Sequence, residues 1–302
     1  MDFSVTVLGN SAALPTRNRN TTAQVVTHNN SIFLLDCGEG TQNRIREYGI
    51  RFSKASHIFI SHLHGDHYYG LPGLITSLHL YKREQPLTIY APPGLKPIIE
   101  LNLNVSQTRL SYPLQIVEVH ESDLAIYEDD FIEIKPITMR HRIPCFGYLF
   151  SEKKERVNIL TDALRDYKIP FDEIESIKSG KDFSHAQGYT IPHEKLVVKR
   201  AARRYAFCSD TLFNLDYCKQ IQGVDLLYHE STFLEADAEK ATERYHCTAK
   251  QAATVALHAG VNKLLLGHFS SRYPSEMLFE QEAKAVFEHS IASVEGACYE
   301  IV

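Results

Sequence analysis

Long apolar runs are missing from this sequence: no stretch reaches about 18 apolar residues, the length that a membrane-spanning helix requires. The first residues, Met1-Asp2-Phe3-Ser4, also lack the basic-then-apolar order of a secretory signal peptide. We therefore expect a soluble, cytoplasmic protein with no membrane partner.

Paired cysteines are a second absence, because none of the six cysteines in the 302-residue chain belongs to a C-x-x-C motif. In a chain of this length, scattered cysteines indicate reduced thiols rather than a disulfide framework. Cys37 and Cys208 lie in strand-like contexts, and we expect both to be small buried hydrophobic side chains.

An excess of basic residues is also absent, since 32 Lys and Arg stand against 37 Asp and Glu, a net charge of −5. This total argues mildly against a polyanionic substrate, although the local distribution of charge matters more.

Repeats and low-complexity linkers are likewise absent, and strand-like runs lead into helical segments along most of the chain. An apolar fraction of 44% is enough for a sizeable core. These features predict one α/β domain with layered sheets and flanking helices. The pattern degrades from Ser151 onwards, where we expect an insertion with two short helices at about 159–167 and 171–178.

The densest polar motif is S-H-L-H-G-D-H at residues 61–67, which follows the apolar run 57–60. Three imidazoles and a carboxylate within residues 62–67 are too dense for a helix face or a packed core. Imidazole and carboxylate are the nitrogen and oxygen ligands that zinc prefers. Alternate residues of a strand end, His62 and His64, can converge on one ion, and the turn at Gly65 directs Asp66 and His67 toward a second.

Isolated candidate ligands recur downstream, each directly after a strand-like run. Loops at strand ends are where α/β folds collect ligands. The candidates together exceed the coordination shell of a single ion, so the sequence predicts two ions. The first site takes His62, His64 and His141, the second takes Asp66, His67 and His268, and Asp210 can bridge the two.

The order H-x-H-x-D-H after a strand resembles the signature of the metallo-β-lactamase superfamily of hydrolases. A closer resemblance is to the short form of ribonuclease Z (tRNase Z), the endonucleases that remove the 3′ trailer from precursor tRNA. The segments H-E-x-T-F, H-x-T and H-x-S-S-R-Y together favour this family. The matching segments, in the family's order, are 14–20, 36–42, 61–67, 209–211, 229–233, 246–248 and 267–273.

The resemblance implies an α/β fold of the metallo-β-lactamase type, an αββα four-layer sandwich that forms a single domain over 1–302 with an inserted arm at about 151–195. It also implies two zinc ions per subunit, a homodimer and precursor tRNA as substrate. The chain departs from the family at two positions. Phe171-Asp172-Glu173 stands where a Gly-Pro pair should follow Ile169-Pro170 in the arm, and Cys247 replaces a serine next to His246.

Catalytic roles follow from the resemblance and from the residue chemistry. Asp66 is expected to be both a ligand and the proton acceptor for the nucleophile. His246, with Glu230 nearby to hold or charge its ring, is the candidate general acid, and the alternative is a plain N-cap histidine on the following helix. The candidate contacts to phosphate and sugar are Arg17, Arg19, Asn20, Thr41, Gln42 and Arg272.

A second basic stretch follows the insertion. If it binds RNA, it reconciles the net charge with a polyanionic substrate, and the alternative is a solvated charged face. The stretch consists of Lys195, Lys199, Arg200, Arg203 and Arg204.

Other functions of the same fold stay open on the sequence alone. A metal-dependent phosphodiesterase acting on small esters or cyclic nucleotides, or an RNA 3′ exonuclease, would use the same metal ions. A β-lactamase-type or thioester hydrolase does not need the Arg- and Asn-bearing loop at 15–20. A non-enzymatic RNA-binding module predicts lost ligands, whereas all the ligand positions are filled here.

Overall fold

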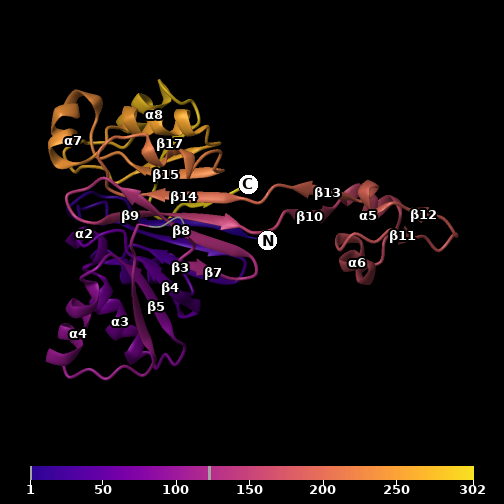
Figure 1. The fold of residues 1–302 in the computed structure, drawn as a ribbon, viewed down its shortest axis with the longest axis horizontal. Coiled ribbons are helices and arrows are strands. Elements are labelled where there is room, and N and C mark those ends of the chain that lie inside the picture. Colours follow the sequence, from indigo (N-terminus) through magenta and orange to yellow (C-terminus); the bar gives the residue numbers. More distant parts are fainter. Residues whose placement is uncertain (1, 122–123) are drawn as a thin grey trace. The chain divides into compact units, whose positions relative to one another are not determined.

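The computed structural model describes residues 2–121 and 124–302. The chain forms two compact units, each with its own packing (Figure 1). The first comprises Met1–Glu128, Glu133–Phe150 and Arg204–Val302, and the second comprises Asp129–Ile132 and Ser151–Arg203.

Two seven-stranded sheets form the centre of the first unit, in the orders β18-β1-β2-β3-β4-β5-β6 and β17-β16-β15-β14-β9-β8-β7. Strands of the first sheet are β1 (Phe3–Gly9), β2 (Ala23–His28), β3 (Ser31–Leu35), β4 (Ala55–Phe59), β5 (Leu87–Ala91), β6 (Leu114–Glu118) and β18 (Cys298–Glu300). Strands of the second are β7 (Tyr127–Glu128), β8 (Ile132–Met139), β9 (Cys145–Glu152), β14 (Arg204–Cys208), β15 (Leu226–Glu230), β16 (Leu264–Gly267) and β17 (Ser290–Ala292).

Helices cover the outer face of each sheet, with α3 and α4 on one side of the first unit and α7 and α8 on the other (Figure 1). Apolar side chains of the helices pack on the strands beneath them, as Leu74 and Ile99 do on one sheet and Ala252 and Phe279 on the other. The helices are α1 (Thr41–Glu47), α2 (Gly65–Tyr68), α3 (Leu71–Leu80), α4 (Leu95–Val105), α7 (Ala238–Arg244), α8 (Ala249–Ala259) and α9 (Met277–Lys284), with short 3-10 turns at η1 (Phe52–Lys54), η4 (Asp216–Lys219) and η5 (Glu235–Asp237).

Aromatic side chains fill the space between the two sheets. Phe33 of β3 packs edge-on against Phe150 of β9 with ring centroids 5.7 Å apart, and Phe59 of β4 packs against Tyr148 at 5.2 Å. The buried Tyr205 hydroxyl of β14 donates to Gln24 Oε1 of β2 at 2.6 Å. The layer order is therefore helix, sheet, sheet, helix, which confirms the predicted αββα sandwich.

Parallel pairing places the ends of several strands at one edge of each sheet. The strands β3 to β6 pair in parallel, and so do β14 to β17. All residues of β15 and β16 are buried, as expected for strands covered on both faces. The loops that follow these strands carry the polar motifs, so the fold gathers them at the carboxyl ends.

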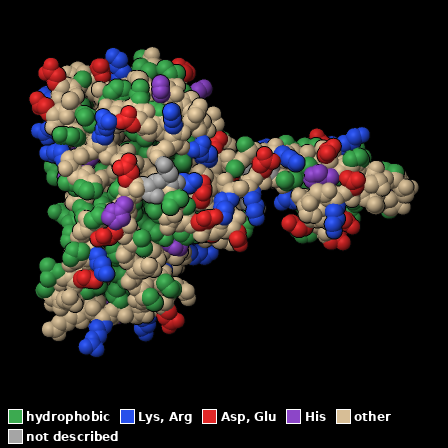
Figure 2. Space-filling view, viewed as in Figure 1, with side chains coloured by type: hydrophobic (Ala, Val, Ile, Leu, Met, Phe, Trp, Pro, Cys, Tyr) green, Lys and Arg blue, Asp and Glu red, His purple; other side chains and the backbone are tan. Residues whose placement is uncertain are grey.

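The second unit has a small core of its own, which includes Ile177, Phe183, Ile191 and Leu196. Two helices lie near the predicted ones, whereas the two antiparallel strand pairs of this unit were not predicted. Its elements are β10 (Arg156–Ile159), α5 (Thr161–Asp166), η2 (Phe171–Glu173), α6 (Ile174–Lys178), β11 (Phe183–Ser184), β12 (Thr190–Ile191), η3 (His193–Lys195) and β13 (Val197–Arg200). Lys and Arg side chains alternate with Asp and Glu on the visible face of this unit (Figure 2).

The basic stretch that follows the insertion divides into two kinds of side chain. Arg203 is buried and donates to the Glu152 carboxylate, with 2.7 Å between Nη2 and Oε1. Arg204 donates to the carbonyl oxygens of Gln220 and Gln222 at 2.7 and 2.8 Å. The expectation that these two arginines contact phosphates is therefore wrong, because both guanidiniums are hydrogen-bonded within the protein. Lys195, Lys199 and Arg200 are exposed.

The sequence also predicts a helix over 277–289, but α9 ends at Lys284 and β17 follows it. The last segment adds one strand, β17 or β18, to each sheet. The helix α7 was not predicted.

Among the helices of the described residues, none combines the length and the apolar character needed to cross a bilayer.

Candidate metal centre

All seven predicted ligands lie just after strands, Asp66 and His67 in the short helix α2 and the other five in loops. The segment 61–67 follows β4 in the first sheet. His141, Asp210 and His268 follow β8, β14 and β16 in the second sheet. Ligands that are far apart in the sequence thus meet where the loops of the two sheets face each other.

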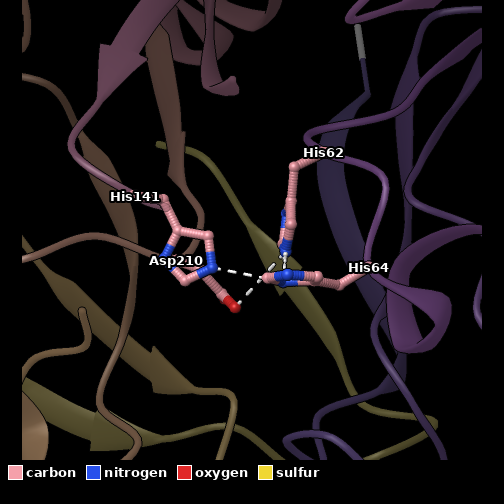
Figure 3. A group of neighbouring side chains, drawn as sticks. All are labelled: His62, His64, His141 and Asp210. Atoms are coloured by element: carbon pink, nitrogen blue, oxygen red, sulfur yellow. Dashed lines mark hydrogen bonds and ion pairs between the residues drawn. The ribbon is translucent and has the colours of Figure 1, made fainter. Parts of the chain in front are cut away.

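Three imidazoles and a carboxylate form the first cluster (Figure 3). Nε2 of His62 lies 3.0 Å, and Nε2 of His141 lies 3.2 Å, from Nδ1 of His64. Asp210 Oδ2 is 3.6 Å from His62 Nε2. Burial lowers the pKa of all three imidazoles below the ordinary histidine value, which favours the neutral form that a metal ion binds.

The second cluster consists of Asp66, His67 and His268. Asp66 Oδ2 lies 3.4 Å from Nε2 of each histidine. Asp210 contacts this cluster as well, with Oδ2 3.6 Å from His67 Nε2 and Oδ1 3.3 Å from His268 Nδ1. Asp210 therefore lies between the two clusters, where the sequence analysis expected a bridging ligand.

Hydrogen bonds to the protein fix which ring nitrogen faces the centre. His141 Nδ1 donates to the Tyr245 carbonyl at 3.1 Å, and His67 Nδ1 donates to Asp36 Oδ2 at 2.7 Å. The Thr232 hydroxyl donates its single hydrogen to Glu230 Oε2 at 2.7 Å. It therefore accepts a hydrogen bond from His268 Nδ1 at 2.9 Å. In each ring this leaves Nε2 as the free lone pair, the arrangement typical of metal-binding histidines.

Two observations test whether these residues fit a metal ion. His67 Nε2 and Asp210 Oδ1 are buried and have no hydrogen-bond partner among the described residues. Burial opposes a positive charge on His67, yet the carboxylates of Asp66, Asp210 and Asp36 raise its pKa well above the ordinary value. A negative potential with free donor atoms suits a cation, and nitrogen and oxygen donors suit a divalent metal ion. The residues fit a divalent metal site.

Asp36 supports the centre and was not among the predicted site residues. Its carboxylate accepts from the Ser61 backbone at 2.7 Å, from the Ser61 hydroxyl at 2.9 Å and from His67. Asp36 does not cap the following helix, because Gly40 occupies the N-cap position of α1. Asp36 lies directly after a strand, as the predicted ligands do, and this position was the signal that could have identified it.

Glu230 is fully buried at the end of β15 and joins three loops. Its Oε1 accepts from the backbone N–H groups of Thr211 and Cys247, at 3.2 and 2.9 Å. Its Oε2 accepts from the backbone and hydroxyl of Thr232, at 3.0 and 2.7 Å. Burial raises the pKa of this carboxyl, but His246 outweighs burial and the net shift is downward, so Glu230 is a carboxylate.

His246 lies against this carboxylate, with 3.2 Å between Nδ1 and Glu230 Oε1. Burial disfavours its charged form, but the Glu230 and Asp210 carboxylates prevail and raise the pKa of His246 to about 9. The alternative of a plain N-cap histidine is wrong, because Thr248 caps α8 in a capping box with Gln251. The side chain is free to act as a proton donor facing the pocket.

A pocket of about 720 Å³ opens over the clusters, and Asp66, Asp210, His246 and His268 line it. Of the six predicted substrate contacts, Arg272 is in its wall, with its guanidinium 5.4 Å from the Phe233 ring centroid. Two arginines in the same wall, Arg142 and Arg244, were not predicted.

The other five predicted contacts lie outside that wall. Arg17 is exposed and, with Arg19, lines a second pocket of about 660 Å³. Four of the five are already engaged within the protein, so their contact with a substrate is a prediction that this geometry does not support. The engaged groups are Arg19 with Glu276 at 2.6 Å, Asn20 with Glu295 at 2.8 Å, the buried Thr41 with the Gly38 carbonyl at 2.7 Å, and Gln42 with Ser77 at 2.8 Å.

Relatives of known name share both the sequence and the fold. The chain is 43% identical over 301 residues to a ribonuclease Z of Bacteroides fragilis, with 98% of each chain covered. It is 41% identical over 295 residues to a ribonuclease Z of Porphyromonas gingivalis, with 97% of each covered. The chain belongs to the ribonuclease Z family. The predicted family is thereby confirmed.

Solved structures agree with this assignment, and a family model of another name matches part of the chain. The crystal structure of human tRNase Z, short form, is 26% identical with a TM-score of 0.74, and 99% of each chain is covered. The metallo-β-lactamase fold protein YhfI from Bacillus subtilis, 17% identical, has a TM-score of 0.71 with 99% of this chain and 100% of that one covered, which confirms the fold. Residues 3–177 match a family model described as Anti-Pycsar protein Apyc1, a match that leaves Asp210, His246 and His268 outside it.

The role of Asp36 leads to a first prediction. Asp36→Asn replaces a carboxylate oxygen with an amide N–H. This change weakens the hydrogen bond from His67 Nδ1 and so loosens the orientation of the ring whose Nε2 faces the centre. Metal affinity should fall by roughly 10- to 100-fold, the usual effect of losing such a supporting carboxylate. Competition titration against a chromogenic chelator measures it. Asp162→Asn, which removes an exposed carboxylate of the second unit, is the matched control. Equal affinities of Asp36→Asn and the control would contradict the assignment.

Proposed function

We propose that this protein is a zinc-dependent endoribonuclease that cleaves the 3′ trailer from precursor tRNA, leaving a 3′-hydroxyl on the tRNA and a 5′-phosphate on the trailer. One observation carries the proposal: two metal-type clusters share Asp210 beside a paired His246 and Glu230, in a chain related over its whole length to ribonuclease Z. A homodimer in the cytoplasm is part of the proposal and rests on the family resemblance.

Two zinc ions per subunit are the proposed cofactors. Bound zinc lowers the pKa of water toward neutrality and neutralises charge on phosphoryl oxygens. The donor atoms described above divide naturally between two ions. We assign His62, His64 and His141 to the first, Asp66, His67 and His268 to the second, and Asp210 to both.

The proton transfers fall to residues of the pocket wall. The leaving group is a ribose 3′-oxygen, which is a poor one unless it receives a proton. His246 can supply that proton because Glu230 holds its ring and favours the imidazolium form. Asp66 is the proposed proton acceptor for the nucleophile, and the Ala13 N–H donates to its Oδ2 at 2.8 Å, which fixes the carboxylate in the wall.

Cleavage of RNA tests the function directly. The purified protein should cut a precursor tRNA once at the 3′ end of the tRNA, and a chelator should abolish cutting. Sequencing the product ends distinguishes a single internal cut from stepwise trimming. A ladder of shortened trailers would favour the exonuclease alternative, and hydrolysis of bis(p-nitrophenyl) phosphate without any tRNA cleavage would favour a small-ester phosphodiesterase. Neither alternative is favoured by the relatives of known name.

The metal content is a separate prediction. Protein purified without chelator should contain about two equivalents of zinc per chain, because the ligands exceed one tetrahedral shell. Elemental analysis by mass spectrometry gives the ratio of zinc to protein. Full activity of a preparation that holds one ion per chain would rule out the two-ion assignment.

His246 is predicted to act on the leaving group. His246→Ala should slow precursor-tRNA cleavage by roughly two to four orders of magnitude, the usual contribution of a general acid. The loss should be much smaller for bis(p-nitrophenyl) phosphate, because p-nitrophenolate leaves without a proton. Steady-state rates on both substrates measure this difference. His258→Ala, which changes an exposed histidine of α8, is the control. Losses of equal size on the two substrates would exclude the acid role.

A further inference from the structure

Two arginines in the wall of the metal-centre pocket have no role in the mechanism above. Arg142 and Arg244 both line the pocket of about 720 Å³ and are both exposed. Within residues 2–121 and 124–302, the structure gives neither guanidinium an ion pair. Arg272 in the same wall differs, because Asp237 lies 3.6 Å from its Nη1. Arg140, two positions before Arg142, is paired with Asp216 at 2.6 Å.

A hydrogen bond between the loops brings these two arginines to the same rim. Arg142 follows His141 in the loop after β8, and Arg244 ends α7 directly before Tyr245. His141 Nδ1 donates to the Tyr245 carbonyl at 3.1 Å, and the two rings are 6.4 Å apart. The side chains next to this junction therefore border the pocket together, on the side where His141 turns its Nε2 toward His64 (Figure 3).

The positive charges of Arg142 and Arg244 together favour binding of an anion. Two guanidiniums without carboxylate partners at one rim repel each other unless an anion lies between or beside them. A planar guanidinium binds a phosphate through two parallel hydrogen bonds, which a lysine cannot match. Three carboxylates share this wall: Asp66 and Asp210 belong to the metal clusters, and Glu39 is exposed.

We propose that Arg142 and Arg244 bind backbone phosphates of the RNA strand immediately next to the scissile phosphate. They hold the strand across the pocket so that the scissile group lies over the metal centre. This assignment rests on the proposed function, because it requires a polyanionic chain rather than a small ester as the substrate.

Alanine variants of the two arginines test the assignment. Arg142→Ala and Arg244→Ala should each lower kcat/KM for precursor tRNA by about tenfold, the scale of one charge-assisted contact, and the double variant by about a hundredfold. Each lost contact should flatten the dependence of log Kd on log salt by about 0.7, the value for single strands. In each variant the loss on bis(p-nitrophenyl) phosphate should be smaller than the loss on RNA, because the small ester has no flanking phosphates. Arg140→Ala, which removes an exposed arginine outside the pocket wall, is the matched control.

Neutral linkages in the RNA identify the contact itself. A precursor tRNA with methylphosphonates on both sides of the scissile phosphate should bind the wild-type protein more weakly. The double variant should bind this RNA as tightly as the wild-type protein does, because the phosphate charges that the two arginines contact are absent from it. A double variant that binds and cleaves normal precursor tRNA like Arg140→Ala would overturn the assignment and leave the proposed function intact.

Two other results separate the assignment from the function. Equal losses on RNA and on the small ester would also overturn it, since the arginines would then act on the scissile group or the metal centre. If the wild-type protein binds precursor tRNA but does not cleave it, the proposed function fails, and the salt dependence of binding still decides whether the arginines contact phosphates.

Discussion

The buried carboxylate of Glu230 is the constraint on which the rest of the centre depends. A charge without access to water is tolerated only if hydrogen bonds replace its hydration. Glu230 obtains them from Thr211, Thr232 and Cys247, which lie in three separate loops. Those loops carry Asp210 and His246, so satisfying one carboxylate also places the bridging ligand and the candidate acid. The hydroxyl of Thr232 extends this effect to His268, whose Nδ1 proton it accepts.

Asp36 performs the matching function in the other sheet. Its carboxylate fixes the Ser61 backbone and the His67 ring, and therefore the start and the end of the motif at 61–67. Backbone strain accompanies this precision. Asp36, Tyr245 and His268 have φ values of 56°, 60° and 60°, in the left-handed region that side chains with a Cβ rarely adopt. Such conformations cost free energy and persist where the surrounding structure imposes them, which is typical of functional sites.

The sequence predicted what is local and missed what depends on tertiary contacts. The ligands were identifiable because each follows an apolar strand, and the continuous burial of β15 and β16 matches their apolar runs. By contrast, Arg203 looks basic and available in the sequence, and only the folded chain brings Glu152, 51 positions away, against it. The hairpin of β11 and β12 has two residues per strand, too few for a periodicity to appear. Arg142 and Arg244 matter through the pocket they share, which no sequence spacing reveals.

The location of the acidic side chains of the metal centre helps to explain how a protein with a net negative charge can take an RNA substrate. Asp36, Asp210 and Glu230 are buried in the centre, and Asp66 faces the same cluster, so these carboxylates count in the net charge of −5 without facing a substrate as free anions. Two divalent cations bound among them would bring the total close to zero. The pocket wall holds three arginines and one exposed carboxylate, Glu39, outside the metal clusters. These near charges act on an approaching phosphate more strongly than the distant net charge, which salt screens over about 8–10 Å. An RNA strand is thus attracted to the mouth of the centre although the chain as a whole is acidic.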